Sequence, residues 1–214
     1  MTIPSARPFL EKNPIVPVVV LKRVEDAVPL AKALVAGGIT SAEVTFRTAA
    51  APEAIKAIAE EVPEITAGAG TVVTREQAEQ AIDLGAKFLV SPGWSADVAD
   101  VAAEREVPFL PGVANATDII ATLPYGLDVV KFFPAVPMGG LPVVKALAAP
   151  FPQLKFMPTG GISAKNLPQW LENPVIASVG GSWMVASKLI EAGEFDEITR
   201  LSKEALDIVK EVRG

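Results

Sequence analysis

The chain has 214 residues, half of them hydrophobic, and a formal net charge of −6. This length suits one domain with a substantial core, so we expect a single domain over residues 1–214. No Lys/Arg cluster supports nucleic-acid binding, no apolar run is long enough to span a bilayer, and residues 1–13 lack the apolar core of a signal peptide. We therefore expect no nucleic-acid or membrane partner, and a cytoplasmic location.

The sequence contains neither cysteine nor histidine. Without cysteine it has no disulfide, no thiolate nucleophile and no Cys-ligated metal. Without histidine it lacks the commonest general base and metal ligand, and it cannot form a Ser-His or Cys-His nucleophile pair. If the chain is an enzyme, its chemistry depends on carboxylates, lysines, hydroxyls and backbone dipoles, and we expect neither a metal nor a cofactor.

Short apolar runs alternate with helical patterns from the start of the chain. An opening helix near residues 7–13 has Phe9 and Leu10 available to cover an open end of the core. Pro29 suits only the first turn of the next helix, which favours a start later than Val24. The first half of the chain predicts strands at 15–21, 41–47, 65–69 and 87–91, and helices at 24–35, 52–61 and 74–85.

The same alternation continues to the end of the chain. Thr74, Ser95 and Asn115 are predicted to cap helices, and Pro142 fits the first position of another. The second half predicts strands at 107–111, 128–132, 155–157 and 175–179, a helix after Ser163, and helices at 182–190 and 194–212.

Eight strand–helix units with nearly all-apolar strands predict an α/β fold, a TIM (β/α)8 barrel with a short N-terminal helix. The second interpretation is a doubly wound open sheet. That fold predicts a Gly-rich fingerprint after the first strand, and residues 18–26 contain no glycine.

The predicted strand at 128–132 carries a lysine, Lys131, among apolar residues. Burial of a lysine disfavours its charged form and makes a nucleophilic amine available. The alternative is that Lys131 lies at the strand end and extends its ammonium group to water. This strand alone does not separate the two interpretations.

The strand at 41–47 alternates polar and apolar side chains. Glu43, Thr45 and Arg47 share one face of the strand, because successive side chains point to opposite sides. Charges on an inward face are costly unless they pair with each other or with a ligand. The structural alternative is a Glu43–Arg47 ion pair that Lys131 could also join, and we favour a functional site because perturbed charges cluster at such sites.

Glycine and hydroxyl residues follow several predicted strands, where a barrel places its active site. Residues 68–71 read Gly-Ala-Gly-Thr, and Pro92 follows Ser91 at the end of another strand. Two further strands are each followed by two glycines and then a hydroxyl residue, at 160–163 and 180–182. Exposed amides at a helix start bind phosphate, so we favour a phosphate site over a pair of tight turns.

These groups together describe one chemistry. Lys131 attacks a ketone and forms an iminium, which acts as an electron sink, and Glu43 transfers protons. Arg47, supported by Thr71, holds a carboxylate. With the glycine segments holding a phosphate, the predicted partner is a small phosphorylated 2-keto acid and the reaction is a retro-aldol cleavage.

Eight stretches of this chain match one known family. The chain resembles the 2-keto-3-deoxy-6-phosphogluconate (KDPG) aldolases, which are class I aldolases, over nearly its whole length from Ile15. The stretches are Leu34-Val-Ala-Gly-Gly38, Glu43-Val-Thr-Phe-Arg-Thr48, Gly68-Ala-Gly-Thr71, Ser91-Pro-Gly93, Leu110-Pro-Gly-Val113, Lys131-Phe-Phe-Pro-Ala135, Pro158-Thr-Gly-Gly-Ile162 and Gly180-Gly-Ser-Trp183.

The resemblance implies a role for each matched residue. Lys131 is the Schiff-base lysine, Glu43 the general acid/base, Arg47 and Thr71 contact the pyruvate carboxylate, and Thr159 contacts the substrate. Pro92 is placed with the substrate-binding residues. The phosphate site is formed by Gly160, Gly161, Gly181 and Ser182.

The resemblance also implies a reaction and an assembly. The family cleaves KDPG to pyruvate and glyceraldehyde 3-phosphate in the Entner–Doudoroff pathway, and members often cleave 4-hydroxy-2-oxoglutarate (KHG) to pyruvate and glyoxylate. They are typically homotrimers of (β/α)8 barrels. Some members use an arginine near the end of the first strand to hold phosphate, and here Lys22 stands in that region.

Two rival functions belong to other classes. A sugar-phosphate isomerase or epimerase can use the same barrel, but those enzymes rely on histidine, which this chain lacks. A barrel that serves as a scaffold with a vestigial site is the non-enzyme alternative. Nothing in the motifs favours it, because each expected catalytic side chain is present.

Overall fold

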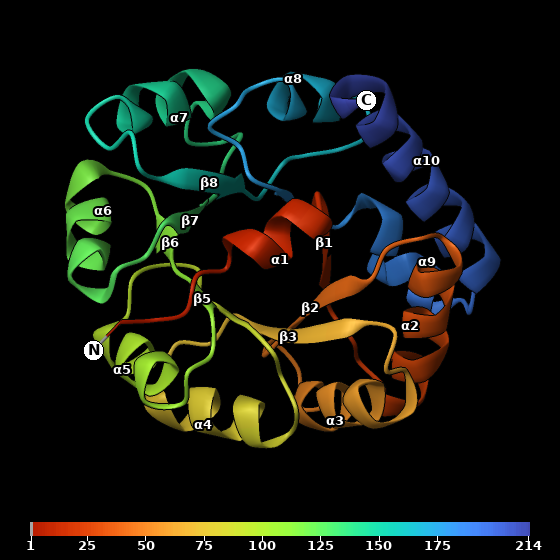
Figure 1. Cartoon of the computed structure of the whole chain (residues 1–214). Helices are drawn as coiled ribbons and strands as arrows, with labels where there is room; N and C mark the ends of the chain where they lie inside the picture. The colour runs from red at the N-terminus through yellow and green to blue at the C-terminus, as the bar shows by residue number, and fades with distance from the viewer. Residues whose placement is uncertain (1) are drawn as a thin grey trace.

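Parallel strands occupy the middle of the molecule and helices surround them (Figure 1). The structure is a computed structural model that describes residues 2–214. Its strands are β1 (Ile15–Val19), β2 (Ser41–Thr45), β3 (Thr66–Gly70), β4 (Leu89–Val90), β5 (Phe109–Leu110), β6 (Gly112–Val113), β7 (Val129–Phe132), β8 (Lys155–Pro158) and β9 (Val179–Gly181).

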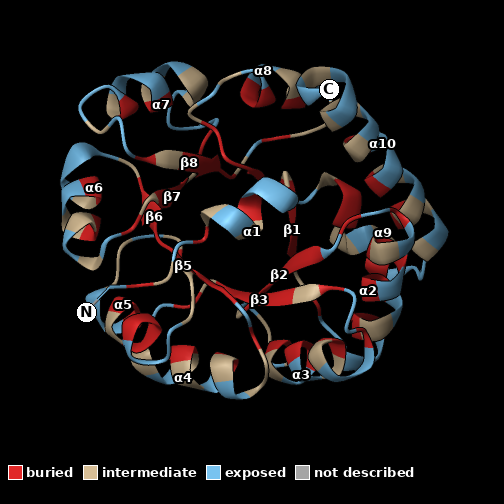
Figure 2. Cartoon of the chain, in the orientation of Figure 1, coloured by how far each residue is buried: buried red, intermediate tan, exposed pale blue. Residues whose placement is uncertain are grey.

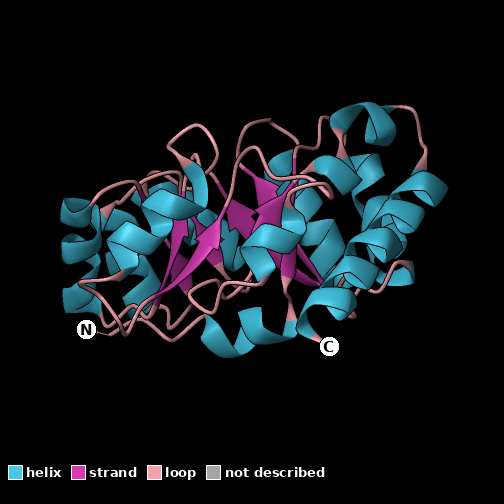
Figure 3. Ribbon diagram, turned by 90° about the horizontal axis from the view of Figure 1, so that it is seen from above, coloured by secondary structure: helices cyan, strands magenta, loops and turns pink. Residues whose placement is uncertain are grey.

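Most helices follow a strand and pack on the outside of the sheet (Figure 3). They are α1 (Arg7–Lys12), α2 (Ala27–Ala36), α3 (Ala51–Glu61), α4 (Arg75–Asp83), α5 (Ala96–Glu104), α6 (Ala116–Thr122), α7 (Gly140–Ala148), α8 (Leu167–Leu171), α9 (Ser187–Glu191) and α10 (Phe195–Arg213). Three 3-10 helices join them: η1 (Val24–Asp26), η2 (Leu123–Tyr125) and η3 (Trp183–Val185).

The strands form a curled parallel sheet rather than a flat one. Six of them pair in the order β5-β4-β3-β2-β1-β9, and three pair in the order β6-β7-β8. β5 and β6 are consecutive along the chain and are separated only by Pro111, which has no N–H to donate to a ladder. Two isolated parallel bridges, Phe156 to Ile176 and Thr159 to Gly180, connect the β8 segment with the β9 segment.

The last strand lies later than the sequence indicates. We expected it at 175–179, but β9 begins at Val179. The N–H groups of Val175 and Ile176 bond to Asn173 in a turn instead of a ladder. Gly180 and Gly181 therefore lie inside a strand, paired with β1, rather than in the loop that follows it.

Several helix starts agree with the capping expectations. Thr74, Ser95 and Asn115 each accept a hydrogen bond from the backbone N–H three residues later. α2 begins at Ala27, which leaves Pro29 in its first turn. The expectation for Pro142 was wrong, because α7 already begins at Gly140.

Apolar side chains form two cores, and most strand residues are buried (Figure 2). The larger core lies between the strands and the helices around them. The smaller core lies on the inner face of the curled sheet and includes Val16, Leu110 and Met157. Leu10 of α1 is fully buried in it, and the ring of Phe9 packs 4.8 Å from that of Phe88. The short first helix thus covers one end of the inner core, as the sequence predicts.

None of the helices formed by residues 2–214 has both the length and the apolar content needed to cross a bilayer.

Candidate active site

Lys131 lies on the inner face of β7, next to Gly112 of β6 and Met157 of β8. Only 3% of the residue is exposed, so its amine does not extend to water. The Nζ atom lies 3.3 Å from Oε1 of Glu43, which is itself fully buried. The structure therefore joins the two residues that the sequence predicts as nucleophile and proton carrier, although 88 positions separate them along the chain.

Glu43 projects from β2 into a space that a glycine leaves open. A Cβ atom at Gly70 would lie 2.2 Å from Glu43 Oε1, so any larger residue there would displace the carboxylate. The second oxygen, Oε2, is buried and has no hydrogen-bond partner among residues 2–214. Buried polar atoms are normally paired, so this oxygen is available to a bound molecule. Of the ion-paired alternative, the contact between Glu43 and Arg47 does not form, whereas the contact between Glu43 and Lys131 does.

Arg47 follows the end of β2 and points its guanidinium to the mouth of the site. Its Nε donates a 3.0 Å hydrogen bond to Oγ1 of Thr71, and none of the carboxylates in residues 2–214 lies within 4.0 Å of it. Thr71 holds its hydroxyl there with a left-handed backbone, φ +58°, which is unusual for a β-branched residue. The remaining guanidinium donors are free to bind an anion in bidentate geometry.

A cavity of about 130 Å³ opens beside these groups at the carboxyl ends of the strands. Thr159, on its wall, has a buried hydroxyl with no partner in the described part of the chain. Gly180 makes this position possible, because a Cβ there would lie 2.1 Å from Thr159 Oγ1. The cavity is lined by Val18, Arg47, Phe133, Thr159, Gly160, Gly161, Ile162, Gly180, Gly181 and Ser182.

Six of the ten predicted site residues line this cavity. Lys131 and Glu43 do not line the cavity themselves. Phe133 does, and its ring centroid lies 5.3 Å from Lys131 Nζ, so this ring lies between the cavity lining and the buried pair. Thr71 is attached through Arg47. Pro92 does not line the cavity; its carbonyl packs over Gly112, the pairing neighbour of Lys131.

Four lining residues were absent from the sequence prediction: Val18, Phe133, Ile162 and Gly180. Phe133 and Gly180 lie within motifs that were noted because of neighbouring residues. The sequence therefore pointed to these two segments, although not to these two residues. Ile162 also lies within such a motif, whereas Val18 is an ordinary apolar residue that only the fold places at the wall.

The proposed phosphate end differs in detail from the predicted pattern. Gly160 and Gly161 adopt left-handed backbones, φ +104° and +79°, which glycine tolerates. The hydroxyls of Ser163 and Ser182 cap no helix, because α8 has Asn166 as its N-cap and η3 has no side-chain cap bond. The two glycine segments thus line the cavity without a long helix behind them.

Lys22 is engaged elsewhere, since its Nζ lies 2.8 Å from Oε1 of Glu191. Among residues 2–214 no three His, Cys, Asp or Glu side chains gather in a way that could hold a metal ion.

An inward lysine in contact with a carboxylate, beside a cavity at the carboxyl ends of parallel strands, is the arrangement of an α/β enzyme site. Comparison with known proteins defines the family. The sequence model of the KDPG and KHG aldolases matches residues 7–201. The chain is 50% identical over 200 residues to 2-dehydro-3-deoxy-phosphogluconate aldolase of Treponema pallidum, covering 94% of this chain and 95% of that one.

Two solved structures have the same fold. KDPG aldolase of Legionella pneumophila, with pyruvate captured as a covalent carbinolamine intermediate, superposes with a TM-score of 0.90 at 41% identity, covering 93% of this chain and 97% of that one. KDPG aldolase of Zymomonas mobilis with 3-phosphoglycerate gives 0.86 at 46% identity, covering 93% and 94%. The chain belongs to the KDPG and KHG aldolase family, as its sequence motifs indicated.

Proposed function

We propose that this chain is a class I aldolase that cleaves KDPG to pyruvate and glyceraldehyde 3-phosphate, with Lys131 as the Schiff-base lysine. The observation that carries the proposal is the buried Lys131 amine, 3.3 Å from the Glu43 carboxylate in a member of this aldolase family. The pyruvate carbinolamine of the Legionella relative is the intermediate expected when a lysine adds to a ketone.

The reaction follows from the positions of the two groups. The neutral amine of Lys131 adds to the C2 carbonyl, and loss of water gives an iminium that draws electrons toward nitrogen. Glu43 accepts the proton of the C4 hydroxyl while the C3–C4 bond breaks, which releases the aldehyde and leaves an enamine. Protonation of C3 and hydrolysis of the imine then release pyruvate and restore the lysine.

The ends of the substrate are held by different groups. Arg47, steadied by its bond to Thr71, binds the carboxylate, and Thr159 has a free buried hydroxyl for a substrate oxygen. Gly160, Gly161, Gly181 and Ser182 are the proposed phosphate site, which is supported by the phosphorylated ligand of the Zymomonas relative. Pro92 acts only indirectly in this proposal, by supporting the strand next to Lys131.

The same site suits cleavage of the shorter KHG, which has no phosphate. For that substrate, only Lys131, the carboxylate of Glu43 and the contact with Arg47 are needed. The matching family includes KHG aldolases. The isomerase, epimerase and scaffold alternatives are not favoured, because the family is one of aldolases.

We further infer that the curled sheet is a closed (β/α)8 barrel formed by one domain over residues 1–214. Counting β5 and β6 as one interrupted strand leaves eight strand positions, and the two bridges between the β8 and β9 segments support closure. The homotrimer implied by the resemblance and the cytoplasmic location expected from the sequence stay predictions.

Trapping with pyruvate tests the lysine. The protein is incubated with pyruvate and reduced with borohydride, and the intact and peptide masses are measured. We expect one pyruvate-sized adduct on the peptide that contains Lys131, absent from Lys131→Ala. An unmodified protein, or adducts only on surface lysines, overturns the mechanism.

The role of Glu43 is tested separately. Glu43→Gln keeps the shape of the side chain but cannot accept the proton, so we expect partial retention of the trapped adduct with a fall in kcat of about 10²–10⁴. Unchanged turnover would remove Glu43 from the proton transfer.

A further inference from the structure

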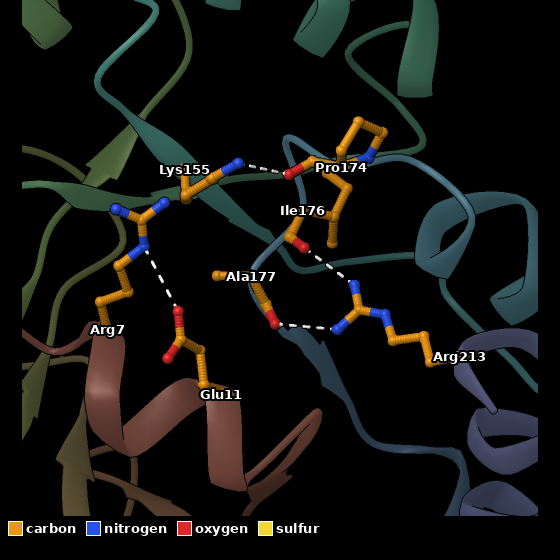
Figure 4. Close-up of a pocket in the computed structure, with 7 residues that line it drawn as sticks. All are labelled: Arg7, Glu11, Lys155, Pro174, Ile176, Ala177 and Arg213. Atoms are coloured by element: carbon orange, nitrogen blue, oxygen red, sulfur yellow. Dashed lines mark hydrogen bonds and ion pairs between the residues drawn. The ribbon is translucent and has the colours of Figure 1, made fainter.

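A second cavity, of about 260 Å³, lies at the opposite end of the curled sheet from Lys131 (Figure 4). It is formed where the start of α1, the start of β8 and the end of α10 meet, and it is lined by Arg7, Glu11, Lys155, Pro174, Ile176, Ala177 and Arg213. The proposed aldolase reaction uses none of these residues.

The two cavities lie at the two ends of one sheet face. Successive side chains of a strand point to opposite sides, so every second residue of the β8 segment points to the same side. These residues are Lys155, Met157 and Thr159. Met157 is fully buried in the inner core, beside Lys131. Lys155 at the start of the strand lines the second cavity, and Thr159 after its end lines the first. The inner core thus separates two sites that open in opposite directions.

The second cavity has a positive charge, although the whole chain is acidic. Its lining has three cationic side chains and one carboxylate, which leaves a net charge of +2. Arg7 and Glu11 form the single ion pair, with 3.5 Å between Nε and Oε1, and 66% of the Glu11 side chain is exposed. The terminal nitrogens of Arg7 make no hydrogen bond to residues 2–214.

Arg213, an exposed residue near the end of α10, brings a positive charge to this cavity without a counter-ion. Its guanidinium donates to the carbonyls of Leu171, Ile176 and Ala177 at 2.8–3.2 Å, and none of the described carboxylates lies within 4.0 Å. Partial desolvation of the guanidinium lowers the pKa of Arg213 below its ordinary value. An anion in the cavity would compensate this charge.

Lys155 is similar. Its Nζ donates to the carbonyl of Pro174 at 2.6 Å and pairs with no carboxylate of the described chain. Two of its three N–H donors remain free. Carbonyl oxygens in the cavity wall would repel an anion, but the ones at Pro174, Ile176 and Ala177 already accept bonds from Lys155 and Arg213.

We propose that this cavity binds a small dianionic oxyanion, such as a phosphate ester or a dicarboxylate metabolite, between Arg7, Lys155 and Arg213. A dianion matches the net charge of +2 and supplies the counter-charge that Lys155 and Arg213 lack. A purely structural role explains Arg213, which clamps the end of α10 to the segment before β9. It does not explain why the free donors of Arg7 and Lys155 line the same cavity.

Thermal unfolding with inorganic phosphate or malonate, at constant ionic strength set with sodium chloride, tests this site. Three proteins are compared: the unaltered chain, Arg7→Gln/Lys155→Gln, and a control, Lys12→Gln/Lys203→Gln. The control removes two positive charges from exposed positions outside the cavity, on α1 and α10, the two helices that line it. Phosphate bound at the active site affects all three proteins equally, so the difference between them reports the second cavity.

A ligand that binds only the folded state raises Tm with concentration. We expect a rise of several degrees in the unaltered chain and the control, and a Kd about tenfold weaker in Arg7→Gln/Lys155→Gln, because charge-assisted hydrogen bonds are lost. Aldolase activity without added anion should be unchanged in that variant. If it does not fold, Arg7→Gln alone, altered at a half-exposed position, replaces it.

Equal shifts in all three proteins, or none in any, would overturn the proposal. Stabilisation by phosphate but not malonate identifies a phosphate ester as the ligand class, and the reverse identifies a dicarboxylate. Because activity is measured in the same proteins, failure of the proposed aldolase function is distinguished from failure of this site.

Discussion

The two ends of the inner sheet face use buried or partly buried charges in opposite ways. At the carboxyl end, Lys131 and Glu43 form a buried pair, and Glu43 Oε2 and Thr159 Oγ1 have no partner among residues 2–214. At the amino end, Arg213 and Lys155 direct their N–H groups to backbone carbonyls. The unpaired atoms at the carboxyl end are buried acceptor oxygens, whereas the amino-end cavity combines N–H groups that bond to the main chain with the free donors of Arg7 and Lys155.

This difference separates a site built for chemistry from one built around structure. An unpaired buried oxygen costs about 1–3 kcal/mol, and at Glu43 and Thr159 a bound ligand would supply the missing partner. Cations bonded to carbonyls connect segments that are distant in sequence, and a ligand there would add to an arrangement that already holds the chain ends. Mutations at the two ends should therefore have different balances of stability and activity.

The largest effect on stability is expected at the catalytic pair. Lys131→Met leaves Glu43 buried without its cation, which should lower the free energy of unfolding by roughly 3–5 kcal/mol. The double variant Glu43→Met/Lys131→Met removes both charges, and we expect it to be at least as stable as the unaltered chain while inactive. Urea unfolding of the three proteins measures this. A double variant less stable than the unaltered chain would mean that the pair stabilises the fold.

The next effect concerns the geometry of Glu43. Gly70→Ala places a methyl group 2.2 Å from the position of Glu43 Oε1 and must displace the carboxylate. A misplacement of about 1 Å can cost roughly 10² in rate, so we expect kcat to fall by that order while pyruvate trapping at Lys131 persists.

Gly93→Ala is the matched control for this change, because a Cβ there meets nothing within 4 Å. It should leave kcat unchanged. A normal kcat in Gly70→Ala would show that Glu43 finds an equivalent position and that Gly70 does not position it.

At the amino end, replacing a charged side chain should affect stability alone. Arg213→Met removes three hydrogen bonds between α10 and the segment before β9, and we expect a loss of about 2 kcal/mol in the free energy of unfolding. Lys210→Met, at an exposed position on the same helix, should change little. A fall in kcat of Arg213→Met measured well below its Tm would show that the two ends are coupled.

Much of the carboxyl-end site could be predicted from the sequence because its signals are local. A lysine in an apolar strand, and the alternation of Glu43, Thr45 and Arg47, are visible within a few residues. The structure places Lys131 against Glu43 and Arg47 against Thr71, as these patterns indicated. Their catalytic roles are still predictions.

The features that were missed depend on contacts between distant segments. The fit of Glu43 to Gly70 needs the register of β2 with β3. The amino-end cavity joins Arg7, Lys155 and Arg213, residues from both ends and the middle of the chain, and each looks like an ordinary surface charge in the sequence. The shift of β9 has the same origin, since the turn at Asn173 and the bonds from Arg213 occupy the backbone groups that a strand would need.

The smallest effect on stability is expected for the hydrogen bond between the Tyr125 hydroxyl and the charged side chain of Asp100. The hydroxyl of Tyr125 donates to Asp100 Oδ1 at 2.8 Å, and this bond, together with burial and the negative charge, raises the pKa of the Tyr125 phenol above its usual value near 10. A raised pKa means stabilisation that is fully present below the unfolded-state value and lost as pH rises through the folded-state value. Because the chain has one tyrosine, its ultraviolet absorbance titration reports this group alone. Asp100→Asn should return the midpoint toward 10 and lower stability at neutral pH by no more than about 1 kcal/mol. An unmoved midpoint would assign the shift to burial instead of the bond, and this polar contact would then contribute less than its geometry indicates.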